Sequence, residues 1–275
     1  MDTIALGISV AQLSSLLGSK HAPLVIDVRR AVAFEADSVV IASAMWRDPF
    51  ALDDWTKFMP RHRDIVVYCV HGHEISKNTC SALQGAGATA RYLEGGIEAW
   101  HEAKGATVRK GVVTGVPSRQ NAPSKWITRE RPKIDRVACP WLIRRFIDPL
   151  AEFIYVPAGD VSRRAAELGA IAYDVPGVTF THRGDQCSFD ALIEDFQIVD
   201  PALNVLATIV RGADTGVPDL TPQSAGLLAI SLGLSALHAV DHKMLAEGMN
   251  VYDAFYAWAK SARSEIHNAA LFKPK

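Results

Sequence analysis

The stretch that decides the fold of the first half is "DIVVYCVHGHEIS", residues 64–76. Four apolar residues stop at Cys69, and a short loop that contains Gly72 leads into helical residues from about Ser76. A buried run that ends before a helix is typical of a strand in a parallel α/β sheet, where reactive groups gather beyond the strand carboxyl ends. We therefore expect Cys69 at a strand end, with a helix N-terminus behind it.

The same alternation continues on both sides of this stretch. The pattern predicts strands over residues 23–29, 64–69 and 90–96, and helices over residues 9–17, 76–87 and 97–105. The second and third helices close on glycine, which is a common helix stop. Strands that alternate with helices predict an α/β domain with a parallel sheet over residues 1–110.

Composition limits the classes of protein that the chain can belong to. With 275 residues, 49% hydrophobic and 21% charged, it has an ordinary globular composition and the length of two domains. The formal net charge of -1 gives no global field that would attract nucleic acid or a membrane. The cysteines (Cys69, Cys80, Cys139 and Cys187) are widely spaced, without a CxxC pair, which suits a reducing cytosol.

Two segments, the N-terminus and residues 224–240, bear on whether the chain is exported or inserted in a membrane. The N-terminus lacks the basic start and continuous apolar core of a signal peptide. Residues 224–240 are strongly apolar but short, contain Ser, Gly and His, and precede charged residues. We expect a buried helix there rather than a membrane span, and a cytoplasmic protein with no membrane or nucleic-acid partner.

The second half of the chain changes in character. Residues 111–124 are rich in Gly, Pro, Ser and Asn and predict a linker. After it, the pattern predicts strands over 125–130, 151–157, 170–176 and 178–182, and helices over 140–148, 162–169, 189–196, 201–212 and 222–263. These elements predict a separate, helix-rich α+β domain over residues 125–275.

Three chemistries compete for Cys69. Zinc would need a tetrahedral set of ligands, but Cys69, His71 and His73 lie on one tight loop with no second cluster nearby in sequence. A tyrosine-phosphatase-type site needs an arginine where this chain has Ile75. A thiolate that accepts and passes on sulfur needs only a nucleophile, access, and a cradle of backbone N–H groups, which Gly72 permits. A buried cysteine without a chemical role remains the alternative.

Three motifs then carry a resemblance. "VIDVR" (residues 25–29), "VVYCVHGHEIS" (66–76) and "ARYLEGGIEAWHEAKG" (90–105) occur in the order typical of a rhodanese domain, which residues 1–110 resemble. The resemblance implies a persulfide on Cys69, a small thiosulfate-like donor, a thiol acceptor and no required cofactor. It also implies a set of active-loop and substrate-binding residues: Val70, His71, Gly72, His73, Glu74 and Arg29.

The chain departs from the rhodanese pattern in two places. The usual "F-x-x-G-H-I-x-G-A" is replaced by "FEADSVVIASA", residues 34–44, so that loop is rebuilt. Glu74 puts an acid on the rim where the family often has a cation or a small polar residue, which disfavours thiosulfate. His71 and His73 could attract an anionic donor when protonated, or could be loop residues without a role. We expect Cys80 to be a core residue rather than a resolving thiol.

A basic stretch opens the second half. Residues 125–146 carry seven cations against two anions, which predicts either a solvated basic face or a site for an oxyanion, a nucleotide or an acidic partner. Pro140 suits the first position of a helix, so we expect Cys139 to cap that helix, where a thiolate is favoured. The candidate oxyanion site comprises Arg136, Cys139, Arg144 and Arg145.

Histidines and acids farther on suggest a possible metal site. His182 follows a predicted strand, Cys187 precedes a predicted helix, and His238 and His242 are spaced to share a helical face. The candidate metal ligands are His182 with Asp241 or His242. Ordinary polar packing is the alternative.

The second half also resembles a known family. "RPKIDRVACPWLIRRFIDPLAEFIYVP", "HRGDQCSFDALIEDF" and "GMNVYDAFYAW" make residues 125–270 similar to the chromate-resistance domain at the C-terminus of ChrB-like proteins. This implies a role in chromate resistance or oxyanion stress, with chromate or sulfate as ligands. No helix-turn-helix candidate remains beside it. The alternatives are a non-catalytic sensor of chromate, another oxyanion or a metal, and direct reduction of chromate by Cys139 or Cys187.

Overall fold

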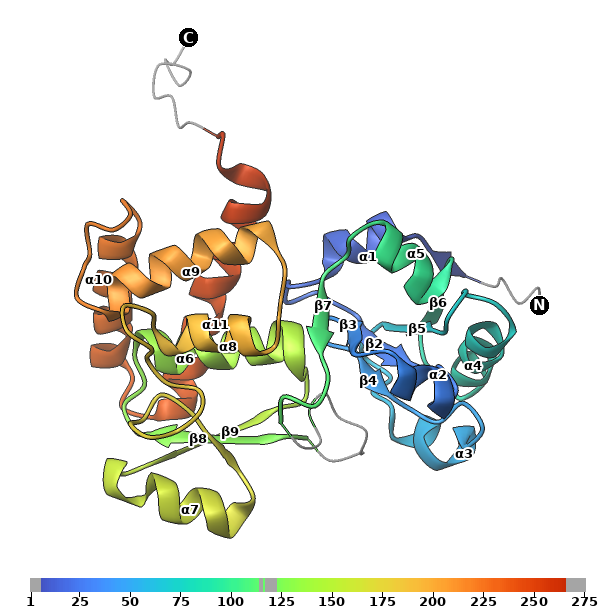
Figure 1. Ribbon diagram of the computed structural model, residues 1–275, viewed down its shortest axis with the longest axis horizontal. Coiled ribbons are helices and arrows are strands. Elements are labelled where there is room, and N and C mark those ends of the chain that lie inside the picture. Colours follow the sequence, from blue (N-terminus) through green and yellow to red (C-terminus); the bar gives the residue numbers. More distant parts are fainter. Residues whose placement is uncertain (1–5, 114–115, 117–122, 266–275) are drawn as a thin grey trace.

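The computed structural model describes residues 6–113, 116 and 123–265 (Figure 1). Two domains lie side by side, and we call them the first domain (residues 6–109) and the second domain (residues 123–265). Most of the predicted linker, residues 111–124, lies outside the described residues, although Val116 is buried in the core.

The first domain is built on a five-stranded sheet. The strand order is β1 (Gly7–Ile8), β6 (Ala90–Leu93), β5 (Ile65–Tyr68), β2 (Leu24–Asp27) and β4 (Met45–Trp46), and every pairing is parallel. The strand that ends at Cys69 is therefore the middle one. The predicted parallel α/β sheet is confirmed.

Helices cover both faces of this sheet. Val66 and Tyr68 of β5 pack on the face covered by α1 (Val10–Leu16) and α5 (Gly96–Glu102). Ile65 and Val67 pack on the opposite face, with residues of α3 (Leu52–Trp55) and α4 (Glu74–Gly85). Because neither face meets water, the strands read as continuous apolar runs instead of alternating ones.

The rebuilt loop of the first domain, residues 34–44, lies beside the last strand of that domain. After the short helix α2 (Ala31–Ala36), β3 (Val39–Ile41) pairs antiparallel with β7 (Thr107–Arg109). The N–H of Arg109 then donates to the carbonyl oxygen of Phe196 in the second domain, at 2.9 Å. The segment that departs from the rhodanese pattern, residues 34–44, thus pairs through β3 with the last strand before the chain enters the second domain.

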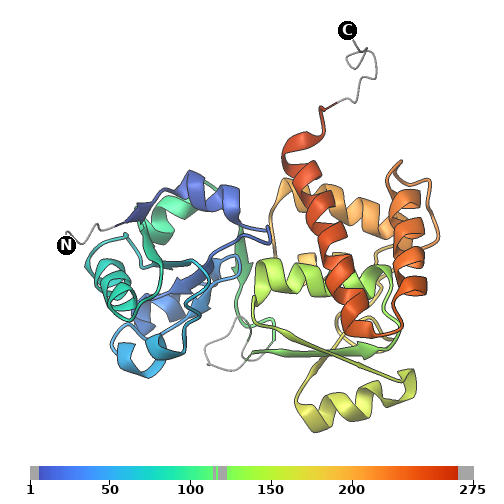
Figure 2. The ribbon, with the colours of Figure 1, turned by 180° about the vertical axis from the view of Figure 1, so that it is seen from behind.

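The second domain has a three-stranded parallel sheet in the order β10 (Ile171–Ala172), β8 (Lys125–Arg129), β9 (Glu152–Val156). Figure 1 shows α7 (Val161–Leu168) below these strands and a group of helices above them. That group comprises α6 (Ile134–Leu142), α8 (Ser188–Asp195), α9 (Pro201–Asp214), α10 (Ser224–Leu237) and α11 (Asp241–Ala257), seen from behind in Figure 2. A helix-rich α+β domain is confirmed.

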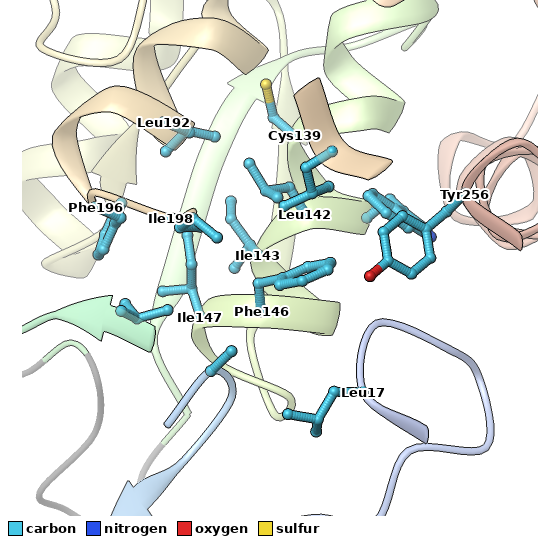
Figure 3. Packing of buried hydrophobic residues seen from close by; sticks show 14 of the residues in the cluster. Leu17, Cys139, Leu142, Ile143, Phe146, Ile147, Leu192, Phe196, Ile198 and Tyr256 are labelled. Carbon is cyan, nitrogen blue, oxygen red and sulfur yellow. The ribbon is translucent and has the colours of Figure 1, made fainter. Parts of the chain in front are cut away.

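The two domains share one hydrophobic cluster. Leu17 of the first domain lies beside Phe146 and Tyr256 of the second (Figure 3). Gly18 has a φ of +76°, and a Cβ atom there would lie 2.5 Å from Cε1 of Tyr256. Lys260 of the second domain donates from Nζ to the carbonyl oxygen of Leu17 at 3.2 Å and so caps the end of α1. The second domain has its own sheet but not its own isolated core.

Two predicted elements of the second domain were wrong. The helix expected to start at Pro140 starts at Ile134, so the proline lies inside α6, and a π-helical turn follows over Ile143–Ile147. Proline removes a helix hydrogen bond, but α6 packs in the core along most of its length, and this packing outweighs the loss. The predicted strand over residues 178–182 is reduced to one bridge between Tyr173 and Phe180.

The helix predicted over residues 222–263 also differs from its prediction. The segment forms two helices rather than one, because His238 adopts an extended backbone between α10 and α11. The core side of α10 is largely serine, including Ser231, whereas Ile230 and Leu237 are 45% and 77% exposed. The predicted helix is therefore confirmed over Ser224–Leu237, but its predicted burial is wrong. Among the helices that the structure describes, none is long and apolar enough to cross a membrane.

Candidate functional site

Cys69 directly follows β5 and lies at the base of a short loop. The residue is 6% exposed, and its Sγ atom lies 3.3 Å from Oγ of Ser76, in the first turn of α4. Ser76 also donates from Oγ to the carbonyl oxygen of His73, at 3.1 Å. The thiol therefore sits beneath the loop with a hydroxyl beside it. The sequence pattern does not single out Ser76, although this serine is the first residue of the predicted helix over 76–87.

The loop after Cys69 is held from below by the start of α5. The N–H of Ile97 donates to the carbonyl oxygen of Cys69 at 3.0 Å, and the N–H of Glu98 donates to that of Val70 at 3.2 Å. Gly72 has a φ of +71°, and a Cβ atom there would lie 2.5 Å from the carbonyl oxygen of Leu93. The close packing of loop and helix therefore depends on glycine.

Imidazole and carboxylate groups form the rim of the loop. His71, His73 and Glu74 are all exposed, and the two imidazole rings lie 5.8 Å apart. Nδ1 of His71 lies 2.8 Å from Oε2 of Glu98, a residue that the sequence did not single out. Because both partners are more than half exposed, this pair contributes little to stability. The rim thus carries two carboxylates among its histidines.

Arg29 does not belong to this loop, so its predicted role in substrate binding is wrong. Its guanidinium is 2% exposed and bonds to Asp27 at 2.7 Å, to Asp37 at 2.6 Å and to the carbonyl oxygen of Val39 at 3.1 Å. Burial alone would lower the pKa of Arg29, but hydrogen bonds and the charge of Asp27 raise it. Arg29 is a buried structural cation that ties β2 to β3.

The other three cysteines are less favourable nucleophiles. Burial raises the pKa of Cys80, which packs in the core as expected. Cys139 is fully buried inside α6, and burial, followed by the charge of Asp135, raises its pKa well above the usual value. The expected capping thiolate at Cys139 is therefore wrong. Cys187 does cap α8, yet burial, followed by Asp135, raises its pKa too.

Each arginine of the predicted oxyanion site is bonded to different protein oxygens. Arg145 forms a bidentate ion pair with Asp253, at 2.8 and 2.9 Å. Arg144 donates to the carbonyl oxygen of Ala151 at 3.1 Å, and Arg136 is committed to backbone and carboxylate oxygens nearby. With Cys139 buried, these four residues do not form the predicted site.

The structure also separates the predicted metal ligands: Asp241 and His242 contact residues other than His182. Oδ1 of Asp241 accepts a hydrogen bond from the N–H of Arg131 at 3.0 Å, and the ring of His242 packs on Tyr155 at 5.5 Å. Neither belongs with His182, so both predicted partners are wrong.

His182 faces carboxylates that the sequence analysis did not assign to it. Its Nε2 atom lies 3.0 Å from Oδ2 of Asp214, 3.6 Å from Oδ1 of Asp174 and 3.7 Å from Oδ2 of Asp135. We call these four residues the carboxylate cluster. Asp135 comes from the first turn of α6, Asp174 follows β10, and Asp214 ends α9. No local sequence spacing links these positions, because only the tertiary fold brings them together.

Comparison with known proteins bears on both domains. Residues 9–103 match the rhodanese-like domain family, and residues 126–259 match the family "ChrB, C-terminal domain". The chain is similar to Protein ChrB of Cupriavidus metallidurans, with 36% identity over 157 residues, 56% of this chain and 47% of that protein. The chain thus spans about half the length of this relative.

Solved structures similar to part of this chain include two proteins whose names contain the word rhodanese. A rhodanese-related protein from Thermoplasma volcanium has 28% identity and a TM-score of 0.34, covering 38% of this chain and 97% of that one. A rhodanese-like domain protein from Staphylococcus aureus has 25% identity and a TM-score of 0.31, covering 34% of this chain and 90% of that one. From the family matches and the fold, the chain joins a rhodanese-like domain, residues 9–103, to a ChrB C-terminal domain, residues 126–259.

Proposed function

We propose that this protein is a sulfurtransferase in which Cys69 accepts a sulfane sulfur from a small donor and passes it to a thiol. The observation that carries the proposal is the position of Cys69. The thiol ends the middle strand of the sheet, under a loop fastened to α5 through the carbonyl oxygens of Cys69 and Val70. Reactive groups of parallel sheets collect at this end of the strands.

The reaction divides into two displacements at sulfur. The Cys69 thiolate attacks the outer sulfur of thiosulfate, an Sγ–S bond forms, and the donor S–S bond breaks with its electron pair leaving on sulfite. The acceptor thiolate then attacks the outer sulfur of the persulfide, so a new S–S bond forms on the acceptor. The Sγ–S bond breaks and restores the Cys69 thiolate, and no electron carrier is consumed.

The loop is suited to hold the persulfide anion. We assign this role to the N–H groups of Val70 to Glu74, together with the positive end of α4. The binding of two loop carbonyl oxygens to α5 supports this role, because a carbonyl oxygen turned toward the sulfur would repel an anion. Ser76 adds a hydroxyl 3.3 Å from Sγ, and it can donate to the thiolate if its proton turns away from the carbonyl oxygen of His73.

The rim bears on the choice of donor. Glu74 and Glu98 both lie beside the loop and are exposed, so they repel a dianion such as thiosulfate. We therefore propose that thiosulfate is a poor donor and that a sulfane sulfur compound with less negative charge is a better one.

We connect this activity to chromate resistance through the second domain, which matches the ChrB C-terminal domain. We place the activity in the cytoplasm. The four cysteines of the chain are free thiols, and persulfide chemistry requires reduced thiols. In cells, a chain that carries Cys69→Ser should then restore chromate tolerance less well than the unmodified chain.

The direct test is the rate of sulfur transfer to cyanide, measured with thiosulfate and with a less charged sulfane sulfur donor. We expect Cys69→Ser to lower this rate by about 10³-fold or more, because a hydroxyl replaces the nucleophile. Cys80→Ser is the matched control, since Cys80 lies in the core of the same domain and should leave the rate close to that of the unmodified protein. Transfer that survives in the Cys69 variant would remove the proposal.

A further inference from the structure

The carboxylate cluster of the second domain has more negative charge than its surroundings compensate. Asp174 has two cationic partners, because its Oδ2 lies 3.4 Å from Nε of Arg136 and 3.6 Å from Nη2 of Arg129. Among the described residues, the ion pairs of Asp135 and Asp214 involve only His182. Two carboxylates therefore share one imidazole.

Asp135 shows this lack of compensation most clearly. Its side chain is fully buried, and its Oδ2 atom accepts a hydrogen bond from the N–H of Ser188. Within the part of the chain that the structure describes, its Oδ1 atom has no hydrogen-bond partner. A buried carboxylate oxygen without a partner is costly, and a bound cation is one way in which such a group is stabilised.

The position of Asp214 supports the same conclusion. It is the last residue of α9, where the helix dipole is negative and a carboxylate is unfavourable. A cation placed between Asp214 and Asp135 would offset the repulsion between the two carboxylates.

The distance between His182 and Asp214 fits a bound ion, and the distance between His182 and Asp135 is slightly longer than that fit requires. Nε2 of His182 lies 3.0 Å from Oδ2 of Asp214 and 3.7 Å from Oδ2 of Asp135. With metal bonds of about 2.1 Å, neighbouring ligand atoms lie about 3.0 to 3.5 Å apart. The ligand atoms of Asp135, His182 and Asp214 are all within 4.8 Å of one another.

We propose that Asp135, His182 and Asp214 bind one divalent transition-metal ion, such as Zn²⁺ or Mn²⁺. The imidazole favours a transition metal over Mg²⁺ or Ca²⁺, which prefer oxygen ligands. His182 is 42% exposed, so the ion would be open to solvent on one side. Three protein ligands and an open side are typical of metal sites that bind a further ligand. Asp174, which accepts from Oγ of Ser188 at 2.8 Å, would support the site from outside.

The inference goes beyond the sulfur chemistry of the first domain. The competing account of the same geometry is a proton shared between Asp135 and Asp214, with no ion. Both accounts keep the two carboxylates close together, but only one requires a metal.

The test uses the untagged full chain, freed of metal with a chelator and titrated with Zn²⁺ and then with Mn²⁺ by calorimetry. We expect one ion per chain for at least one of the two metals. His182→Ala and Asp214→Asn should weaken its binding by about 10-fold or more. His182 is partly exposed and Asp214 is 17% exposed, so both variants should fold.

His242→Ala is the matched control, because it removes a histidine of the same domain that packs on Tyr155 outside the cluster. It should bind the ion as tightly as the unmodified chain. The proposal is overturned if neither metal binds stoichiometrically, or if His182→Ala binds as tightly as the unmodified chain. In the first case the shared proton explains the cluster.

Discussion

Cys69 and Cys187 occupy similar local positions but have different surroundings. Each precedes a helix N-terminus, whose dipole favours a thiolate: Cys187 is the N-cap of α8, whereas the loop of residues 70–73 separates Cys69 from α4. Cys187 is fully buried, and burial, followed by the charges of Asp135 and Asp190, raises its pKa. Cys69 instead lies under an exposed loop. A helix N-terminus therefore does not make a cysteine reactive when buried carboxylates surround it.

The largest effect should appear in the alkylation of the folded protein by iodoacetamide. We expect Cys69 to react about 100-fold faster than Cys139 and Cys187, because burial and nearby carboxylates raise the pKa of the latter two thiols. Peptide mass mapping at successive times measures the rates, with unfolded protein as the control in which all four cysteines react. Comparable alkylation rates at Cys69 and Cys187 would contradict the difference in reactivity between the two cysteines. They would also support direct reduction of chromate by a thiol of the second domain.

An intermediate effect should follow from Gly72→Ala. Alanine at a φ of +71° is strained, and its Cβ would lie 2.5 Å from the carbonyl oxygen of Leu93, so the loop must move away from α5. Because a displacement of about 1 Å can cost about 100-fold in rate, we expect kcat for sulfur transfer to fall by about that factor.

Gly85→Ala is the matched control for this loop variant. Gly85 lies at the end of α4, where an added Cβ meets no atom within 4 Å, so transfer should be unchanged. Normal transfer by Gly72→Ala in a folded protein would show that the packing of the loop on α5 is not needed.

The smallest effect should come from Glu74→Gln. Removing one exposed charge from the rim should raise kcat/KM for thiosulfate about 2- to 5-fold at low salt, with the gain shrinking as salt is added. Steady-state kinetics at two ionic strengths measure the change. Glu102→Gln, at the far end of α5, is the control. An unchanged or lower kcat/KM would contradict the role assigned to the rim.

The sequence predicted the first domain well because its determinants are local. The strand ending at Cys69, the loop with Gly72 and the two glycines at the start of α5 all lie within short motifs. Arg29 was misassigned because its partners are not local. A motif cannot show that Asp37 and the carbonyl oxygen of Val39 close around that guanidinium and bury it.

The second domain was less predictable because its main features depend on tertiary contacts. Residues far apart in sequence form the carboxylate cluster, whereas the spacing of His238 and His242 suggested a helical face that the break between α10 and α11 removes. Pro140 by itself predicts a helix start, but packing of α6 in the core overrides this local preference. The serines of α10 face the core while several apolar residues face outward, the reverse of what composition suggests.

The central claim is that Cys69 carries sulfur, and one measurement tests it directly. The intact mass of the protein is recorded after incubation with thiosulfate, or with a less charged persulfide donor, and removal of the excess. The account predicts a gain of one sulfur atom that cyanide removes, and no gain in Cys69→Ser. A gain that persists in the variant, or its absence from the unmodified protein with both donors, would contradict the account.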